Sequence, residues 1–458
     1  MRAAFLCLLL AGCMTVGPDY ERPDMALPGD FPSPTNTTGE IPPDWWKLYR
    51  DPALDQLVAS VHSRNADLRI AAAQVEEAEA VMRQARSAVF PDVNLNFSRT
   101  RSRVGQLTAP PPVASAPLER NDARLVASTS FEIDFWGRVR RAGEAADASL
   151  LGTRLTREVV TLTLGGLTAQ TYFGLRSLDA QIGVLENTIR LRRESLDIAR
   201  ARAQAGLTSE LDVHQAQGAL SDALVQRRDA SRQRALLERQ LAQLAGKLDL
   251  KMAGGDLFAL PVPPTPPAGL PSSLLERRPD VRAAEQTMIA ANALIGSARA
   301  ARFPTVTLTG FLGGQSAAVE DIASSGVWGL GVGVIAPIFD AGRREAVEEQ
   351  AAARYRQTLA SWQKSVEGAF REVSDALVNL EETGNSEADL RARVEAARNA
   401  LELSRVRYES GYSPYLEVLD AQRTANDAEI AFVRNRQARL AFSVDLMRAL
   451  GGGWTEKH

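Results

Sequence analysis

The 458-residue sequence is poor in the side chains from which most active sites are built, with two cysteines and three histidines. Both cysteines, Cys7 and Cys13, stand near the start of the chain. The remainder therefore has no disulfide, no thiol nucleophile and no cysteine-based metal site. The histidines are far apart in sequence, which offers little for a metal site or a general base.

The sequence also lacks an excess of charge and the common catalytic motifs. Its net charge is −3 and its pI about 5.9, so nothing indicates nucleic-acid binding. There is no phosphate-binding loop, zinc-binding histidine motif or nucleophile elbow. Residues 331–336 match a loose dinucleotide pattern, but Pro337 follows where that motif needs a helix. We expect no enzymatic activity, no cofactor and no metal.

The first residues resemble a bacterial lipoprotein signal. Arg2 precedes an apolar run, residues 3–11, that is too short to span a bilayer. The run ends in Leu-Ala-Gly-Cys, which resembles a lipobox, so residues 1–12 would be removed and Cys13 would carry the lipid. An ordinary cleaved signal is the alternative. Met14 follows the cysteine instead of the aspartate associated with inner-membrane retention, which favours the outer membrane by resemblance.

The chain contains an internal duplication. Residues 85–95 and 298–308 are identical at seven of eleven positions, with an offset of 213. Residues 200–217 and 405–422 are identical at seven of eighteen positions, with an offset of 205. Such self-similarity indicates one structural unit used twice. We expect an extended N-terminal segment at 13–50, a first repeat at 51–260, a second repeat at 261–450 and a short tail at 451–458.

Each repeat contains two segments with β-strand periodicity. Pro91 and Pro304 end the preceding helices, because proline lacks the backbone donor. Apolar residues then alternate with small or polar ones in segments 93–98, 125–135, 305–312 and 328–334. We expect β-hairpins at about 92–135 and 304–339. Strands of about ten residues are long enough to cross a bilayer when tilted.

Very long helices follow the strands. No proline occurs between Pro117 and Pro261 or between Pro337 and Pro414. Each predicted helix, 138–205 and 343–410, could reach about 100 Å. Apolar residues at three-four spacing form a seam in each helix, interrupted in the first by Arg192. The members are Leu178, Ile182, Leu185, Ile189, Leu196, Ala199 and Ala203 in the first helix, and Val394, Ala397, Leu401, Ser404 and Tyr408 in the second. Residues 165–166 and 383–386 could mark a kink or a small side domain.

Both long helices end in a tight turn. Gly206 and Gly411 stand where a left-handed C-terminal cap belongs. Ser209 in one repeat and Ser413-Pro414 in the other then restart a helix. The sequence therefore predicts two helical hairpins.

Four membrane-length strands cannot close a barrel by themselves. An open sheet in lipid would leave backbone donors and acceptors unpaired, at a cost of several kcal/mol each. Small barrels need about eight strands. The chain must therefore associate with other copies. A purely structural coiled-coil lipoprotein would explain the helices but not the strands.

Several motifs resemble those of TolC-like outer-membrane factors of the NodT/OprM lipoprotein branch. They are the segment 17–23 (GPDYERP), Trp45-Trp46 with Asp51-Pro52, and the segment 270–281 (LPSSLLERRPDV). The resemblance covers essentially all of the mature chain. It implies an α+β membrane protein in which a homotrimer forms a 12-stranded outer-membrane β-barrel continued by a periplasmic α-helical barrel.

The resemblance also implies the function and partners. The trimer would be the passive exit duct of a tripartite efflux pump for drugs or toxic compounds. It would dock onto a periplasmic membrane-fusion adaptor and an inner-membrane transporter, often of the resistance-nodulation-division class. Type I protein secretion and metal-ion efflux are alternatives. The absence of a methionine-rich cluster slightly disfavours copper.

The family's periplasmic gate maps to the hairpin tips. The two acidic positions of the second tip fall on Glu417 and Asp420, and the locking positions on Asp212 and Tyr408. Ser413 stands where a locking arginine occurs in one TolC pattern. Asp212 is also placed to cap its own helix, a reading that needs no gate.

Three arginines follow the first predicted strand. Arg99, Arg101 and Arg103 continue the outward parity of Leu95 and Phe97. They could meet lipopolysaccharide phosphates at the outer rim, or they could form a solvated strand end.

Overall fold

The structure is a computed structural model that describes residues 15–29, 31, 41–105, 117–266, 272 and 274–454. Cys13 lies outside these residues, as does most of the proline-rich loop between the first two strands. None of the described helices combines the length and the apolar character needed to cross a membrane.

The chain divides into two compact units, and each unit takes residues from both sequence repeats. Unit 1 consists of Met1–Asp24, Val75–Thr153 and Ala284–Trp362. Unit 2 consists of Met25–Gln74, Arg154–Ala283 and Gln363–His458. The repeats are therefore units of sequence, whereas the compact bodies combine equivalent halves of both repeats.

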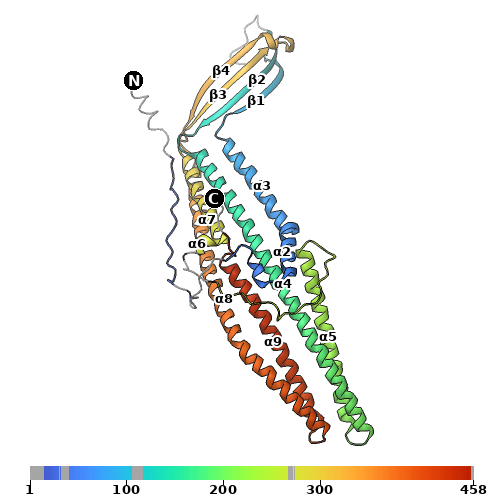
Figure 1. The fold of residues 1–458 in the computed structure, drawn as a ribbon. Coiled ribbons are helices and arrows are strands. Elements are labelled where there is room, and N and C mark those ends of the chain that lie inside the picture. The colour runs from blue at the N-terminus through green and yellow to red at the C-terminus, as the bar shows by residue number, and fades with distance from the viewer. Residues whose placement is uncertain are drawn as a thin grey trace. The chain divides into compact units, whose positions relative to one another are not determined.

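Unit 1 contains one antiparallel sheet in the order β1-β2-β3-β4 (Figure 1). Its strands are β1 Asp92–Arg103, β2 Glu119–Ile133, β3 Thr305–Ser316 and β4 Gly326–Ile335, with the short helix η3 Val319–Ser324 between the last two. The central β2–β3 pair joins the two repeats, with Ala127 opposite Leu312. The predicted hairpins extended too far, because β2 ends two residues before Phe135 and β4 four residues before Phe339.

The helices of unit 1 pack closely through small side chains. They are the later part of α3 Ala66–Ser87, most of α7 Pro279–Ala300, and the first turns of α4 Arg138–Gln204 and α8 Arg343–Glu409. Ala145 and Ala148 of α4 are buried against Ala290 and Ala293 of α7. Glu348 of α8 forms ion pairs with Arg299 of α7 at 2.8 Å and with Arg302, just after α7, at 2.9 Å.

The N-terminal segment 15–24 is fixed to unit 1 by specific contacts. Gly17 has φ +107°, and a Cβ there would come within 2.4 Å of the Gly296 Cα in α7. Glu285 of α7, whose side chain is almost fully buried, accepts from the Tyr20 hydroxyl at 3.0 Å and from the Arg22 guanidinium at 2.6 Å. The backbone N–H of Val16 donates to the carbonyl of Trp136 at 3.1 Å. These contacts give a physical reason for the GPDYERP motif.

Unit 2 contains two long helical hairpins (Figure 1). The first is formed by α4 and α5 Glu210–Leu244, and the second by α8 and α9 Tyr415–Ala449. The predicted ends of the long helices, 205 and 410, are each one residue too late. Both helices continue through 165–166 and 383–386, so no side domain interrupts them.

Aromatic residues fill the main core of unit 2. Trp45 and Tyr49 of η1 Trp45–Tyr49 are fully buried, with Tyr172 and Phe173 of α4. Leucines and valines of α2 Pro52–Arg64 and of α9 complete the cluster. Each such side chain contributes about 1.5–3 kcal/mol by burial. The short helix α6 Leu274–Arg277 lies outside this cluster.

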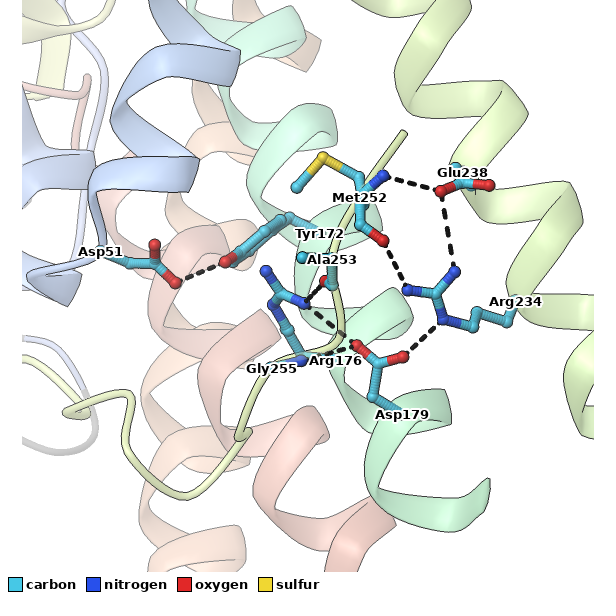
Figure 2. Close-up of polar contacts among 9 residues, drawn as sticks. All are labelled: Asp51, Tyr172, Arg176, Asp179, Arg234, Glu238, Met252, Ala253 and Gly255. Atoms are coloured by element: carbon cyan, nitrogen blue, oxygen red, sulfur yellow. Dashed lines mark hydrogen bonds and ion pairs between the residues drawn. The ribbon is translucent and has the colours of Figure 1, made fainter. Parts of the chain in front are cut away.

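A network of charged side chains fastens the connector after α5, residues 246–266, to both helices of the first hairpin (Figure 2). Asp179 of α4 accepts from Arg176 at 3.0 Å and from Arg234 of α5. The Arg234 Nη2 donates to the Met252 carbonyl at 2.9 Å, and the Met252 N–H donates to Glu238 at 2.7 Å. Buried charges are stable only when paired in this way.

The same network reaches the start of α2. The Tyr172 hydroxyl donates to Asp51 (Figure 2), whose other carboxylate oxygen accepts from the Ala53 N–H at 2.8 Å and so caps α2. Burial, together with the hydrogen bond to Asp51, raises the pKa of Tyr172, which keeps the phenol a donor. The Arg176 guanidinium lies over the Tyr172 ring, 4.7 Å from its centroid.

Candidate functional site

One face of the sheet is apolar and exposed. The pairing register aligns its side chains in five rows, from Ile133–Val306–Val334 at one end to Phe97–Leu125 at the other. Most of the large side chains in these rows are exposed, including Leu95 at 74%, Trp328 at 73% and Leu330 at 80%. The rows span about 27 Å along the strands, close to the height of a membrane apolar band, about 25 Å. An exposed apolar surface of this size marks a contact with lipid or protein.

The opposite face of the sheet is mostly polar or small, although the large apolar Phe311 and Ile335 also belong to it. The Asn96 side chain donates to the Ser128 hydroxyl at 2.8 Å, and Gln315 donates to Asp122 at 2.7 Å. Glycines 329, 331 and 333 of β4 belong to this face. The sheet therefore separates an apolar surface from a wettable one, as the alternation predicted.

Both edges of the sheet are open within the described chain. Among the described residues, β1 pairs only with β2, and β4 pairs only with β3. Each edge therefore presents unpaired backbone donors and acceptors that another chain can satisfy.

The two hairpin turns of unit 2 have the same backbone geometry. Gly206 and Gly411 have φ of +70° and +81°. The N–H of the following residue, Leu207 or Tyr412, bonds to a carbonyl five residues earlier, at 2.9 and 2.8 Å. This 6→1 pattern is the Schellman motif, in which a left-handed glycine closes the helix end.

The first tip is stabilised by its own side chains. Ser209 caps α5, since its hydroxyl accepts from the Leu211 N–H at 3.1 Å. Asp212 in the first turn of α5 accepts from the Thr208 hydroxyl. The carboxylate therefore has a partner within the turn, a side-chain hydroxyl and not the backbone N–H that a capping box uses.

The second tip carries two exposed carboxylates. Glu417 forms an ion pair with Arg407 at 2.9 Å, and Asp420 with Arg423 at 3.2 Å. Pro414 occupies the N-cap of α9 and makes no side-chain capping bond, although the sequence suggested that it would lie inside the first turn. Exposed pairs of this kind are worth little in water, so both acids can respond to other charges.

Tyr408 lies in a small cluster between the hairpins. It is 4% exposed, and its ring lies 5.4 Å from that of the fully buried Tyr415. The Tyr408 hydroxyl has no hydrogen-bond partner among the described residues, so Tyr408 makes no bond to Asp212. Burial raises the pKa of Tyr415 to about 12. Ser413 has a buried hydroxyl that also lacks a partner in the described part of the chain.

Arg202 links the two hairpins near their tips. Its guanidinium donates to the carbonyls of Tyr408 and Glu409 at 2.8 and 3.2 Å and covers the Tyr408 ring at 4.9 Å. A cation at the carbonyl end of a helix satisfies its unpaired acceptors. Arg202 on the first hairpin therefore caps α8 of the second.

Two further polar contacts join the hairpins at seven-residue intervals along α4. The Thr188 hydroxyl meets Asn426 of α9 at 3.1 Å, and Ser195 accepts from Gln422 at 2.9 Å. With Arg202 they form a polar ladder, defined here as positions 188, 195 and 202 of α4. The spacing of one heptad was a usable signal in the sequence, but it identified no partner.

No group of three or more potential metal ligands occurs among the residues that the structure describes. The arrangement consists of an apolar membrane-sized sheet face, open sheet edges and two charged hairpin tips. Such features are typical of a protein that associates with other chains and contacts a membrane.

Comparisons with known proteins agree with this arrangement. A family model described as outer membrane efflux protein matches residues 57–247 and 270–452. The chain is 32% identical over 471 residues to the solvent efflux pump outer membrane protein SrpC of Pseudomonas putida, covering 98% of this chain and 97% of that protein. It is 33% identical over 476 residues to the pyoverdine export outer membrane protein OpmQ of Pseudomonas putida, with the same coverage.

Solved structures show the same fold. The outer-membrane channel OprN superposes with a TM-score of 0.90 at 29% identity, covering 96% of this chain and 99% of that one. The open state of the Neisseria gonorrhoeae MtrE outer membrane channel gives 0.85 at 28% identity, with 96% and 99% covered. The predicted α+β channel fold is confirmed, and the chain belongs to the family of outer membrane efflux proteins.

Proposed function

We propose that three copies of this chain form the outer-membrane exit duct of a tripartite efflux pump. The observation that carries the proposal is the sheet, whose exposed apolar face is as tall as a membrane's apolar band and whose edges are open. Joining the β1 edge of one copy to the β4 edge of the next satisfies both edges. Three sheets then give a closed 12-stranded barrel with lipid outside and the polar face inside.

The N-terminal contacts support lipid anchoring at Cys13. Val16 is bonded to Trp136, between the end of β2 and the start of α4. Val16 is three residue steps after Cys13, a length of chain that spans at most about 10 Å. A lipid on Cys13 would therefore enter the membrane leaflet beside the helix-proximal end of the sheet. Several acyl chains together give stable anchoring.

The second hairpin tip supports a gate at the periplasmic opening. Glu417 and Asp420 are exposed on one turn of α9, and the trimer would bring six such carboxylates to one aperture. A ring of carboxylates favours cations over anions. Asp212, bonded to Thr208 at the first tip, and Tyr408, in the cluster between the hairpins, would hold the tips in position behind this ring.

The family's role in efflux pumps indicates the partners. The hairpin tips would dock onto a periplasmic adaptor, which joins them to an inner-membrane transporter of the resistance-nodulation-division class. Relatives are named for solvents, toluene and pyoverdine. We therefore assign small organic molecules as the cargo of this duct.

Single-channel recording tests the proposal directly. Purified full-length protein should open discrete cation-preferring channels in planar bilayers. Glu417→Ala/Asp420→Ala should reduce the preference for cations and change the conductance. Glu382→Ala/Asp389→Ala removes two exposed acids in the middle of α8 and is the matched control, with an unchanged tip.

Two outcomes would contradict the proposal. If the wild-type protein forms no channels and chemical cross-linking yields no species of three copies, the duct is wrong. If channels form but the tip variant keeps the conductance and selectivity of the wild type, the gate assignment is wrong and the duct remains. A deletion strain's sensitivity to solvents, dyes, bile salts and metals would identify the cargo.

A further inference from the structure

The exposed apolar column of β1 continues directly into three arginines. Val93, Leu95 and Phe97 are 72%, 74% and 60% exposed on one face of the sheet. The next side chains of the same parity are Arg99, Arg101 and Arg103, and all three are exposed. Because side chains alternate strictly along a strand, these arginines share the apolar face and not the polar one.

The sheet register places the first arginine where the apolar band ends. Phe97 lies opposite Leu125 in the last apolar row, and Arg99 lies opposite Ala123 in the next. Trp328 belongs to the row just before Phe97, the row of Leu95. Indole rings favour the membrane–water interface, which puts that boundary at the level of these rows. The arginines therefore begin at the boundary, at the end of the sheet away from the helices.

The arginine column keeps a net positive charge. Arg101 pairs with Glu119 of β2 at 2.6 Å, and both side chains are more than half exposed. Arg99 and Arg103 form no ion pair with any residue that the structure describes. An exposed pair such as Arg101–Glu119 is weak enough to exchange partners.

We propose that Arg99, Arg101 and Arg103 bind the phosphate groups of the outer-leaflet lipid, lipopolysaccharide. The inference rests on the proposed function, since it requires that the apolar face meet lipid. A guanidinium presents paired donors that match phosphate oxygens, and its long stem can lie along apolar surface. From Arg99 to Arg103 the strand rises about 14 Å, so the column crosses the headgroup layer instead of lying in one plane.

Charge complementarity favours a phosphorylated glycolipid over water as the occupant. Three neighbouring arginines need several anionic partners, and lipid phosphates supply them in the headgroup layer. The apolar rows of the sheet end just below the arginines, which places the arginines in that layer. The opposite face at the same height also carries arginines, Arg120 and Arg124, but Arg124 lies over the Phe311 ring at 4.8 Å and faces the duct interior. These two residues provide a control of equal charge on the same hairpin.

Lipid titration of the full-length trimer tests the proposal. Diphosphoryl lipid A, monophosphoryl lipid A and phosphatidylglycerol are added to purified protein in detergent and bound lipid is counted by native mass spectrometry. The wild type should bind diphosphoryl lipid A most tightly. Arg99→Gln/Arg103→Gln should weaken that binding by about tenfold or more and abolish the preference for two phosphates, since each interfacial arginine is worth roughly a fivefold change. Arg99→Lys/Arg103→Lys should fall between them.

The control variant and the channel assay separate the possible failures. Arg120→Gln/Arg124→Gln should keep the wild-type affinity within about twofold. Equal affinity of wild type and Arg99→Gln/Arg103→Gln, or an equal loss in the control, would overturn the proposal. Equal binding of phosphatidylglycerol and lipid A would overturn its assignment to lipopolysaccharide. Each protein is also recorded in planar bilayers. A wild type that forms no channel would refute the proposed function, whereas a wild type that forms channels but does not prefer lipid A would refute only the lipid contact.

Discussion

Arg202 and Arg407 occupy equivalent positions in the two repeats, 205 residues apart, each near the end of a long helix. Arg202 reaches across to the second hairpin and donates to the carbonyl of Tyr408 at 2.8 Å. Arg407 stays within its own hairpin and pairs with Glu417 at 2.9 Å. The residue equivalent to Glu417 in the first repeat is Asp212, which is one methylene shorter and bonds to Thr208 instead.

The comparison shows how a duplicated sequence produces two different tips. The turns are alike, because each depends on one left-handed glycine. The charges differ, because the first tip satisfies its acid locally and sends its arginine outward, whereas the second keeps the arginine and exposes its acids. The first hairpin thus contacts its neighbour through Arg202, and the second presents exposed acids at its tip.

The two repeats also differ in how deeply equivalent leucines of the long helices are buried, and this difference should have the largest effect on stability. Leu196 is 4% exposed in a cluster with Ala216, Leu220 and Ala223. Leu196→Ala should lower the free energy of unfolding by about 2–5 kcal/mol, because a buried cavity is left. The equivalent Leu401 is only partly buried, so Leu401→Ala should cost clearly less. Thermal unfolding followed by circular dichroism measures both, and equal losses would contradict the difference between the seams.

Exchanging the two arginines for an uncharged residue tests their different partners. Arg202→Met should destabilise the protein by about 1.5–3 kcal/mol, since it removes charged hydrogen bonds to two carbonyls. Arg407→Met should cost no more than about 1 kcal/mol, because its pair with Glu417 is exposed. Denaturant unfolding of both variants measures the two losses in the free energy of unfolding. A larger loss for Arg407→Met would show that the comparison is wrong.

The turn glycines should behave alike, unlike the arginines. Gly206→Ala and Gly411→Ala each force a side chain into the left-handed region, at a cost of about 1–2 kcal/mol. A Cβ at Gly206 would meet no atom within 4 Å, and one at Gly411 only Arg202 Nη2 at 3.8 Å, so backbone strain is the common cause. Limited proteolysis at each tip gives the measurement. Unequal effects would reveal a contact particular to one turn.

Replacing both partners of one contact in the polar ladder should change the free energy of unfolding least. Ser195→Ala leaves the buried Gln422 amide without its partner and should cost about 1–3 kcal/mol. Ser195→Ala/Gln422→Leu replaces both polar groups and should cost less than about 1 kcal/mol, because no unpaired group remains. The double variant should also open its channel less often, since the hairpins would then adhere through apolar contact. Unfolding and single-channel open probability test the two statements separately.

The sequence predicted the structure well wherever a single residue, such as proline or glycine, restricts or permits a particular backbone conformation. Pro91 and Pro304 located the starts of the strands, and Gly206 and Gly411 the ends of the long helices, within one or two residues. The alternation of residues 93–97 identified the exposed face before any partner strand was known. These are local effects, which a single sequence contains in full.

The contacts between distant segments could not be predicted in the same way. Arg202 and Tyr408 are 206 residues apart, and nothing local distinguishes Arg202 from the other arginines of α4. Glu285 is an ordinary helix residue by sequence, yet it holds Tyr20 and Arg22. Asp212 was placed in the gate by resemblance and, from Ser209 three residues before it, in a capping box. In the structure its carboxylate accepts from the Thr208 hydroxyl, a partner that neither expectation named.

The close approach of Gly17 to Gly296 fixes the position of the N-terminal segment along α7, residue by residue. Residues added before Val16 would leave the contacts of Gly17, Tyr20 and Arg22 unchanged. Residues added between Gly17 and Tyr20 would shift the phenol and the guanidinium of Arg22 away from Glu285. A pull on the chain before Val16 would therefore be transmitted to Trp136, just after the end of β2, and not to the opposite ends of the strands.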